Sequence, residues 1–497
     1  MYSANFTPLM DVIKSDLDRW ASLPLSWLGR VALIKMNILP RLLYPLQMIP
    51  VLLPSKVVKI IEGWLSSFIW SKRRPRLKLA KLQLSVSEGG LELPNIKWYQ
   101  VAAQLRFVAA WLKGDRSSIW LDIEAAQCDC PLRNLLFLKD PKTVRRFCNN
   151  PIVSNTLKAW RVARLLEGRA KVTSPLTSIQ GNPDFPPGLN DPGFNSWRDG
   201  GITTLGNLFN GPVLMSFDQI QQKYDLPRRH FFRFLQVRDF ILRRTTLLTN
   251  INTSPIERAL TIQFTRGFIS ILYGLLRSNA TINTQDTKRK WERDLGVEIE
   301  DEVWCEMFDN AKKLSVCNRA WSVQLRTIHR LQITPSLRHK MNPSLSPLCL
   351  KCKIEEGDYI HCIWSCHKIQ RYWLRVVQQL NVIFNLEFEL DPLCLILGLT
   401  DNRIADKFHK RLFNLLAYAA RKNILLSWIN EKPPTKKEWH KIIMQCMPLE
   451  FLTCLLRSTT DAFYKTWDPY LRYIGPQLAD TLTIGFLSRS DTANLDG

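Results

Sequence analysis

The chain has 497 residues, of which 46% are hydrophobic, and 17 tryptophans and 23 phenylalanines supply ample core, so an intrinsically disordered protein is excluded. This length accommodates two to four domains. The 68 lysines and arginines outnumber 44 acidic residues and give a formal net charge of +24, which favours a polyanionic partner, although a solvated basic surface would carry the same charge.

The N-terminal segment contains no basic stretch followed by an apolar run, so no signal peptide is expected. The longest apolar segment, Val31 to Pro54, is interrupted by Lys35, Arg41 and several prolines, so no transmembrane helix is expected. Most of the twelve cysteines are scattered, which is typical of a reducing compartment and not of a disulfide framework. We expect a cytoplasmic or nuclear protein, or one found in both compartments.

Three helices are predicted in the first seventy residues. Thr7 and Pro8 are the residue types of an N-cap and of a first helical position. Ser26 is the expected N-cap of a second helix, which Pro40 should stop or kink. A third helix is expected to begin near Ser55, because apolar residues then recur at helical spacing.

A dense basic run, Lys72-Arg73-Arg74-Pro75-Arg76, follows the third predicted helix. It suits contacts with phosphates and suits an ordinary solvated loop equally well. Next, Gly89-Gly90 permits a tight turn, and Leu91 and Leu93 alternate as in a short strand. A further helix is expected from Ile96 to Leu112, where apolar residues again recur at helical spacing.

The middle of the chain is read mainly from its composition. Residues 182–201 combine Pro, Gly, Asn and Asp, which predicts a long loop and a domain boundary. A helical stretch is expected to begin at Ser216. The aromatic residues that follow it are expected to lie mostly in a core, because stacking on bases requires exposed rings. Further helices are expected from Phe408 to Trp428 and from Thr435.

The clearest local signal is a set of four residues of metal-ligand type: Cys349, Cys352, His361 and Cys366. Their spacing, C-x2-C-x8-H-x4-C, is close to what one tetrahedral zinc ion needs and leaves no open position, so the predicted zinc site is structural. Cys362 and His367 could compete as ligands by position. The alternative is a helical hairpin in which the thiols are buried as small hydrophobic groups.

Three aromatic residues lie close to these cysteines, namely Trp364, Tyr372 and Trp373. Aromatic rings held by a zinc knuckle can stack on unpaired bases. Burial of the same rings in a helical core is an equally valid interpretation. The sequence leaves this choice open.

Several segments together resemble a known family. PLSWLGRVALIKMNILPRLLYPLQMIPVLLP, FIWSKRRPR and GGLELPNIKWYQVAAQL occur in this order, and HRLQITPSLRHKM, HCIWSC, PLCLILGL, SWIN and KKEW follow. This succession resembles the part of the reverse transcriptase proteins of long interspersed elements, the LINE-one clade, that comes after the polymerase core. The resemblance spans the chain from about Phe6 to Tyr473. The family's first cysteine pair is commonly one residue wider than Cys349 and Cys352.

The resemblance implies a helical thumb up to about Leu112, which grips a template–primer duplex, followed by an RNA-binding C-terminal region. In the family, an endonuclease and a polymerase palm with paired metal-binding aspartates precede this segment. The sequence contains no adjacent Asp-Asp, so no two-metal site for nucleotide addition is expected. The expectation is therefore a non-enzymatic chain that corresponds to the C-terminal part of such a protein.

We accordingly predict a mainly α-helical fold. The expected domains are a thumb-like domain (1–125), a linking segment (126–200), a helical bundle (201–285), a C-terminal helical domain (286–475) with the knuckle at 349–366, and a flexible tail (476–497). The predicted function is binding of RNA or an RNA:DNA hybrid by a retrotransposon-derived chain, and the expected partner is a nucleic acid, namely RNA, an RNA:DNA hybrid or DNA. The alternatives are part of an active reverse transcriptase whose catalytic half is supplied elsewhere, and a zinc-stabilised protein-interaction module. The residues predicted to contact nucleic acid are Arg30, Lys35, Arg41, Lys72, Arg73, Arg74, Arg76 and Arg330.

Overall fold

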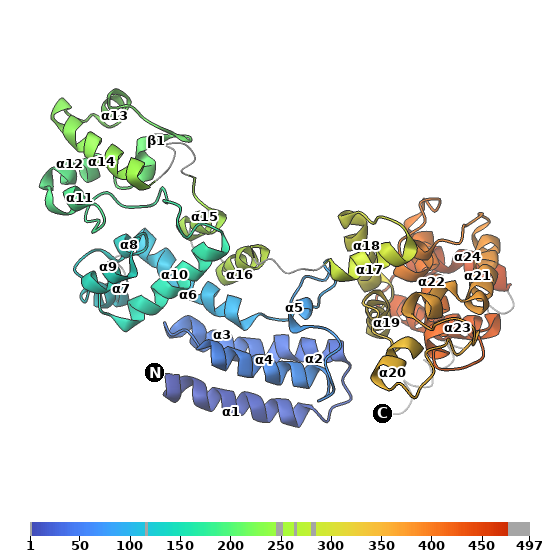
Figure 1. The fold of residues 1–497 in the computed structure, drawn as a ribbon. Helices are drawn as coiled ribbons and strands as arrows, with labels where there is room; N and C mark the ends of the chain where they lie inside the picture. The colour runs from blue at the N-terminus through green and yellow to red at the C-terminus, as the bar shows by residue number, and fades with distance from the viewer. Residues whose placement is uncertain (1, 115–117, 245–251, 263–265, 280–284, 476–497) are drawn as a thin grey trace. The chain divides into compact units, whose positions relative to one another are not determined.

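The computed structural model describes residues 2–114, 118–244, 252–262, 266–279 and 285–475 (Figure 1). These residues form helices connected by loops, with one two-stranded hairpin, which confirms the predicted mainly α-helical fold. Two compact units can be distinguished. The N-terminal unit comprises Met1–Pro75 and Pro94–Ile282, and the C-terminal unit comprises Arg76–Leu93 and Asn283–Gly497. None of the described helices is long and apolar enough to cross a membrane.

The elements of the N-terminal unit are α1 (Tyr2–Trp20), α2 (Trp27–Leu33), η1 (Ile34–Ile38), α3 (Leu39–Met48), α4 (Ser55–Ile69), α6 (Ile96–Lys113), α7 (Ile119–Ala125), α8 (Leu132–Leu135), α9 (Pro141–Phe147), α10 (Pro151–Leu166), α11 (Pro186–Asn190), η2 (Pro192–Phe194), α12 (Asn195–Asp199), η3 (Leu205–Leu208), β1 (Phe209–Asn210), β2 (Val213–Leu214), α13 (Phe217–Tyr224), η4 (Arg228–His230), α14 (Phe231–Arg244), α15 (Pro255–Thr261) and α16 (Phe268–Ser278).

The first helices follow local signals in part. The Ser26 hydroxyl accepts a hydrogen bond from the Gly29 amide and caps α2, as predicted. The predicted start at Thr7 is wrong, because α1 begins at Tyr2 and has Pro8 inside it. Phe6 is buried together with Ile13, so core packing extends the helix toward the N-terminus past the proline.

Pro40 does not stop the second helix. Instead α2 passes through the π-helical segment η1 into α3, and Pro40 occupies one of the first positions of α3. The proline, which lacks an amide, follows directly on the π-helical hydrogen bonding of η1, in which the Leu39 amide donates to the Ile34 carbonyl. Helix α4 begins at Ser55, as predicted.

Helix α6 is the centre of the N-terminal unit. It contacts α3, α10, α15 and α16, and its middle consists largely of buried alanines and aliphatic residues. The Asn95 side chain accepts a hydrogen bond from the Trp98 amide at the N-terminus of α6, and Gly114 ends the helix in the left-handed region. Small residues allow neighbouring helices to approach α6 closely.

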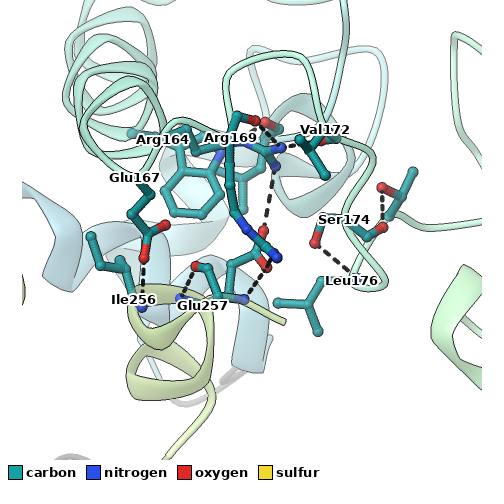
Figure 2. Close-up of polar contacts among 12 residues, drawn as sticks. Arg164, Glu167, Arg169, Val172, Ser174, Leu176, Ile256 and Glu257 are labelled. Carbon is teal, nitrogen blue, oxygen red and sulfur yellow. Dashed lines mark hydrogen bonds and ion pairs between the residues drawn. The ribbon is translucent and has the colours of Figure 1, made fainter. Parts of the chain in front are cut away.

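A buried polar network fastens α15 to α10 (Figure 2). Arg164 of α10 lies 3.4 Å from the carboxylate of Glu257 on α15, and it also donates to the carbonyls of Arg169 and Val172. The Glu167 carboxylate accepts a hydrogen bond from the Ile256 amide. Glu257 is almost fully buried, so these ionic contacts replace its hydration.

The prediction of a long loop at residues 182–201 is wrong. This segment contains α11, η2 and α12, and Phe194 and Trp197 are buried in a core that includes Phe234 of α14. The turn-forming composition reflects several short helices, because prolines and Asx residues occupy their first positions. Ser216 caps α13, as predicted.

One disulfide, Cys128–Cys148, joins α7 and α9 through the segments that follow these helices, where the two residues also form an isolated antiparallel bridge. The absence of a disulfide framework was predicted from the scattered cysteines, and this pair departs from that expectation. Cys130, two residues away, is a free buried thiol, and burial raises its pKa to about 11. The pairing depends on the fold around α9, because twenty residues separate the two cysteines.

The elements of the C-terminal unit are α5 (Leu79–Leu82), α17 (Asp286–Leu295), α18 (Asp301–Lys313), α19 (Asn318–Ile328), α20 (Pro335–Met341), η5 (His361–Ser365), α21 (His367–Phe384), η6 (Leu393–Leu397), α22 (Lys407–Leu426), α23 (Lys436–Leu456) and α24 (Thr460–Ile474). Helix α22 packs against α21, α23, α24 and η6. Thr435 caps α23 in a capping box with Glu438, as the sequence predicts. The tail predicted after Gly475 lies outside the described residues.

Residues 85–93 form a loop and no strand, contrary to the alternation of Leu91 and Leu93. The amides of both leucines donate to the same carbonyl, that of Leu82, and Glu92 has a left-handed φ of 53°. At Gly89, with φ +83°, a β-carbon would lie 2.5 Å from the ring of Phe308. Only glycine therefore fits beneath this ring.

His329 is tied to this loop and should make the C-terminal unit sensitive to acid. Its Nε2 lies 2.7 Å from the Gly89 carbonyl, and burial of the ring lowers the pKa of His329 from 6.5 to about 4. The unfolded chain therefore takes up a proton at a higher pH than the folded chain does. The resulting stability is complete above about pH 6.5 and is lost as the pH falls toward 4.

We expect wild-type protein to lose about 2 kcal/mol more stability than His329→Gln between pH 7 and pH 5. Urea unfolding of both proteins at the two pH values measures this difference, and groups common to both cancel. Equal losses would show that the folded state accommodates a charged His329.

Candidate metal centre and basic surface

The four predicted metal ligands come together in the C-terminal unit. Cys349 and Cys352 lie in the turn before η5, His361 is the first residue of η5, and Cys366 immediately precedes α21. All four side chains are buried, and their ligand atoms lie within 4.8 Å of one another. This group could hold a metal ion.

The distances fit a tetrahedral ion. The sulfur atoms of Cys349 and Cys366 are 3.9 Å apart, and the Cys352 sulfur is 3.3 Å from His361 Nε2. A tetrahedron with Zn–S bonds of about 2.3 Å and a Zn–N bond of about 2.0 Å has edges of about 3.8 Å and 3.5 Å. The observed separations therefore match a zinc-sized ion with three thiolates and one imidazole.

A compact turn places the first two cysteines. The Cys349 amide donates to the Glu355 carbonyl, and the Lys353 amide donates back to the Cys349 carbonyl, each over 2.8 Å. Lys353 adopts a left-handed φ of 61°, which turns the chain sharply after Cys352. Gly357 lies against Cys349, where a β-carbon would be 3.1 Å from the cysteine Cα.

His361 is oriented by neighbouring carboxylates. Its Nδ1 lies 3.0 Å from Glu355 Oε2, and its amide donates to Asp358 Oδ1 over 2.7 Å. Because Glu355 accepts the hydrogen of Nδ1, the lone pair of Nε2 faces the cysteines. Carboxylate partners of this kind are common behind metal-binding histidines.

The surroundings favour a thiolate at Cys349. Hydrogen bonds from Cys362 and Cys366 lower the pKa of the Cys349 thiol, and the same contacts together with burial raise the pKa of Cys362 and Cys366. Cys366 lies at the N-terminus of α21, where the helix dipole acts in favour of negative charge. The ammonium group of Lys351 is buried nearby and donates to the carbonyls of Ser427 and Trp428. A buried cation offsets part of the excess negative charge of three thiolates.

The two competing ligands are placed differently. Cys362 is buried and hydrogen-bonded to Cys349, yet its sulfur is not among the four atoms that converge. His367 is exposed on the first turn of α21. The structure thus brings together the four predicted residues and leaves Cys362 beside them.

The nearby aromatic residues belong mainly to the core. Trp373 is fully buried and donates from Nε1 to the Ile363 carbonyl, and Tyr372 is buried and donates to the Ala420 carbonyl. Trp364 is half-buried, with its ring 5.9 Å from that of Trp373. Stacking on bases is therefore excluded for Tyr372 and Trp373 in this conformation, because stacking requires exposed rings.

Two of the arginines predicted to bind nucleic acid have structural roles instead. Arg30 is buried and donates to the carbonyls of Ala21, Leu23, Leu25 and Phe68. The side chain of Arg330 is 12% exposed and pairs with Asp294, and its guanidinium lies 3.9 Å from the ring of Trp291. We therefore withdraw both from the interface, because phosphate contact would require exposed guanidinium groups.

The remaining predicted residues are at least partly accessible. The basic loop, defined as Lys72, Arg73 and Arg74, is exposed where α4 ends, and Ser71 and Lys72 are both left-handed. Lys72 approaches Asp18 only to 3.8 Å. Arg41 is exposed and pairs with Asp16, and Lys35 is half-buried in η1.

Arg76 is exposed as well, but it belongs to the C-terminal unit. Its Nη1 donates to the Leu331 carbonyl over 2.7 Å. One contact of this kind leaves the other guanidinium hydrogens available to a partner. Six of the predicted basic residues remain, namely Lys35, Arg41, the three residues of the basic loop, and Arg76.

Sequence reasoning missed two residues of this site. Glu355 orients His361, and Lys351 places a positive charge beside the cysteines. Their proximity to Cys352 was the only signal in the sequence, because both roles depend on the turn. No protein-family model matches this chain. The assignment of function therefore rests on the geometry of the metal centre and on the exposed basic residues.

Proposed function

We propose that the chain is a non-catalytic nucleic-acid-binding protein, derived from a LINE-type reverse transcriptase, that binds RNA or an RNA:DNA hybrid. The observation that carries this proposal is the exposed basic loop of three consecutive cations, for which Asp18, 3.8 Å from Lys72, is the one acidic partner among the residues that the structure describes. Residues 1–75 contain ten lysines and arginines and four acidic residues, a net charge of +6. Phosphates attract exposed cations such as those of the basic loop.

We further propose that the metal centre binds structural zinc. Three thiolates and one imidazole are ligands that zinc prefers, and the distances between them match tetrahedral coordination. Four protein ligands leave no position open for a substrate, so the ion would stabilise the C-terminal unit and would not catalyse a reaction. The ion would join the turn at Cys349–Cys352 to the N-terminus of α21.

The proposal includes no nucleotide addition. Two-metal polymerases use paired carboxylates to hold their ions, and this sequence contains no adjacent aspartates. Purified protein should therefore incorporate no nucleotides in a primer-extension assay. Incorporation would replace the binding proposal with an enzymatic one.

The basic loop should account for a measurable share of RNA affinity. Lys72→Gln/Arg73→Gln/Arg74→Gln removes three positive charges, so binding to single-stranded RNA should weaken. The slope of log K against log salt should become shallower by about 2, because each phosphate contact contributes about 0.7. Fluorescence anisotropy with labelled RNA at several salt concentrations measures both effects.

A matched control is available on α9. Lys142, Arg145 and Arg146 are also one lysine and two arginines, exposed on the same unit. Lys142→Gln/Arg145→Gln/Arg146→Gln lowers the net charge equally and should alter affinity less. Equal losses in the two triple variants would show that only total charge matters, and affinity independent of salt would contradict phosphate binding altogether.

A further inference from the structure

A cavity of about 440 Å³ lies in the N-terminal unit between α8, the segment around Ser178–Gly181, and α11 with η2 and α12. Its volume lies within the range of roughly 300–1,000 Å³ that is typical of small-molecule sites. None of the residues predicted from the sequence to contact nucleic acid lines it. All of its lining residues belong to one unit.

Two polar groups in the wall of this cavity are buried without a partner. Arg133 and Ser178 both line the cavity, and Arg133 Nε and Ser178 Oγ are buried without a hydrogen-bond partner among the described residues. The Ser178 residue is 5% exposed. A buried polar group without a partner costs free energy, so a ligand that supplied a hydrogen-bond partner to either residue would recover part of this cost.

The electrostatic balance of the cavity favours an anion. Burial alone lowers the pKa of Arg133, with no carboxylate opposing it, yet an arginine remains charged in proteins. The acidic residue in the wall, Asp191, is already paired with Arg233 through two hydrogen bonds of 2.7 and 3.0 Å. Arg198 at the rim is exposed and lies 3.3 Å from the carboxylate of Asp199, so Arg133 is the cation of the wall that has no carboxylate partner among the described residues. The uncompensated charge is therefore positive.

The walls are held in place before any ligand binds. Asn134 donates from Nδ2 to the carbonyls of Gln180 and Gly181, over 3.0 and 2.7 Å. The Gly181 amide donates to the Gly188 carbonyl over 2.8 Å and joins two sides of the cavity. At Gly188 a β-carbon would lie 2.1 Å from the Ile179 carbonyl, so the backbone packs closely there. A preorganised site loses less entropy on binding.

The cavity is larger than a phosphate group and offers surfaces for a flat, partly polar ring. Pro131 and Pro192 provide apolar walls, and Asn190 and Asn195 provide exposed amides. Amide side chains form bidentate hydrogen bonds with the edges of bases. An anion attached to a base therefore matches the cavity better than an inorganic anion does.

We propose that this cavity binds a single unstacked RNA nucleotide, with its phosphate on Arg133 and Ser178 and its base against the proline and asparagine walls. The inference rests on the proposed RNA-binding function and adds to it a second, more selective contact in the same unit as the basic loop. Splayed single-stranded bases are the usual targets of sequence-specific RNA recognition.

The test uses the full chain with adenosine 5′-monophosphate, adenosine and inorganic phosphate in isothermal titration calorimetry. The monophosphate should bind more tightly than either fragment, because each fragment satisfies only part of the cavity. Arg133→Gln should weaken monophosphate binding by about tenfold to a hundredfold, and Ser178→Ala by about threefold to tenfold. Arg133→Lys should restore only part of the affinity, because lysine lacks the Nε donor.

Arg146→Gln on α9 serves as the control, since it removes an exposed cation that does not line the cavity. Circular dichroism shows whether each variant is folded. If Arg133→Gln does not fold, two other measurements test the proposal. One is monophosphate binding to Ser178→Ala, and the other is whether the monophosphate protects residues 178–198 of the wild-type protein from hydrogen exchange. Unchanged binding in Arg133→Gln, or no protection of 178–198, would overturn the proposal.

Titration with a single-stranded RNA octamer separates this inference from the proposed function. The octamer should lose affinity in Arg133→Gln and, independently, in the basic-loop variant. RNA binding that depends on the basic loop but not on Arg133 would overturn the cavity proposal alone. Wild-type protein that binds the monophosphate but no RNA would overturn both the proposed function and the assignment of the cavity to RNA, and would assign it to free nucleotides.

Discussion

Cys366→Ser should abolish tight zinc binding and destabilise the C-terminal unit by about 5 kcal/mol or more. Structural zinc sites contribute apparent binding free energies of about 10–16 kcal/mol, and much of this is lost when a ligand is removed. Cys366 is fully buried and immediately precedes α21, so the ion would link this helix to the Cys349 turn. Metal analysis and urea unfolding, each with and without a chelator, measure the two effects.

Two cysteines of the same unit serve as controls. Cys394 is buried in η6 away from the metal centre, so Cys394→Ser should lose stability from polar burial but retain one zinc per chain. Cys362→Ser should also retain zinc, because its sulfur is outside the converging group. Loss of zinc in Cys362→Ser and its retention in Cys366→Ser would reverse the ligand assignment. Wild-type protein without bound zinc would contradict the proposed cofactor.

Glu257→Ala should destabilise the N-terminal unit by about 3–5 kcal/mol, because it leaves the buried guanidinium of Arg164 without its carboxylate. The side chains of Arg164 and Glu257 are only 10% and 2% exposed, so water compensates little. Arg169 also approaches Glu257, to 3.9 Å. Urea unfolding measures the loss, and hydrogen exchange of residues 255–261 should show α15 opening first.

The same carboxylate caps α15, and a control separates this role from the ionic one. The Ser254 amide donates to Glu257 Oε2, and the Glu257 amide donates to Ser254 Oγ. Ser254→Ala removes half of this capping box and should cost about 1 kcal/mol. Arg164→Met/Glu257→Leu replaces both charges by apolar groups and should recover much of the stability. If Glu257→Ala lowers the free energy of unfolding no more than Ser254→Ala does, the ion pair contributes nothing beyond the helix cap.

Helix starts that depend on neighbouring residues were predictable from the sequence. Ser26, Ser216 and Thr435 each cap the helix that follows, because a cap needs only its own hydroxyl and an amide three residues later. The start at Thr7 was mispredicted because the burial of Phe6, the residue before it, overrides the local capping signal. The same limit applies at residues 182–201, where core packing turns a loop-like composition into short helices.

The four candidate metal ligands were predictable from local sequence, whereas the roles of two arginines were not. The identities and spacing of the four ligands predicted their convergence, because a C-x2-C turn and a following segment suffice to form most of the site. Arg30 and Arg330 were assigned to nucleic acid from their charge. Their partners, the Phe68 carbonyl and the Asp294 carboxylate, lie 38 and 36 residues away, so no local pattern could reveal them.

The sequence by itself determined the helical class, most helix starts and the metal-ligand set, since each follows from residues within a few turns of one another. Only the tertiary structure decided which cations are free to meet a partner. An arginine that finds backbone carbonyls or a carboxylate in the core becomes part of the fold, as Arg30 and Arg164 do. The basic loop remains exposed because α4 ends there and the chain turns away from the core. Arg133 lines a cavity instead, because α8 places it there, and no carboxylate of the described residues offsets its charge.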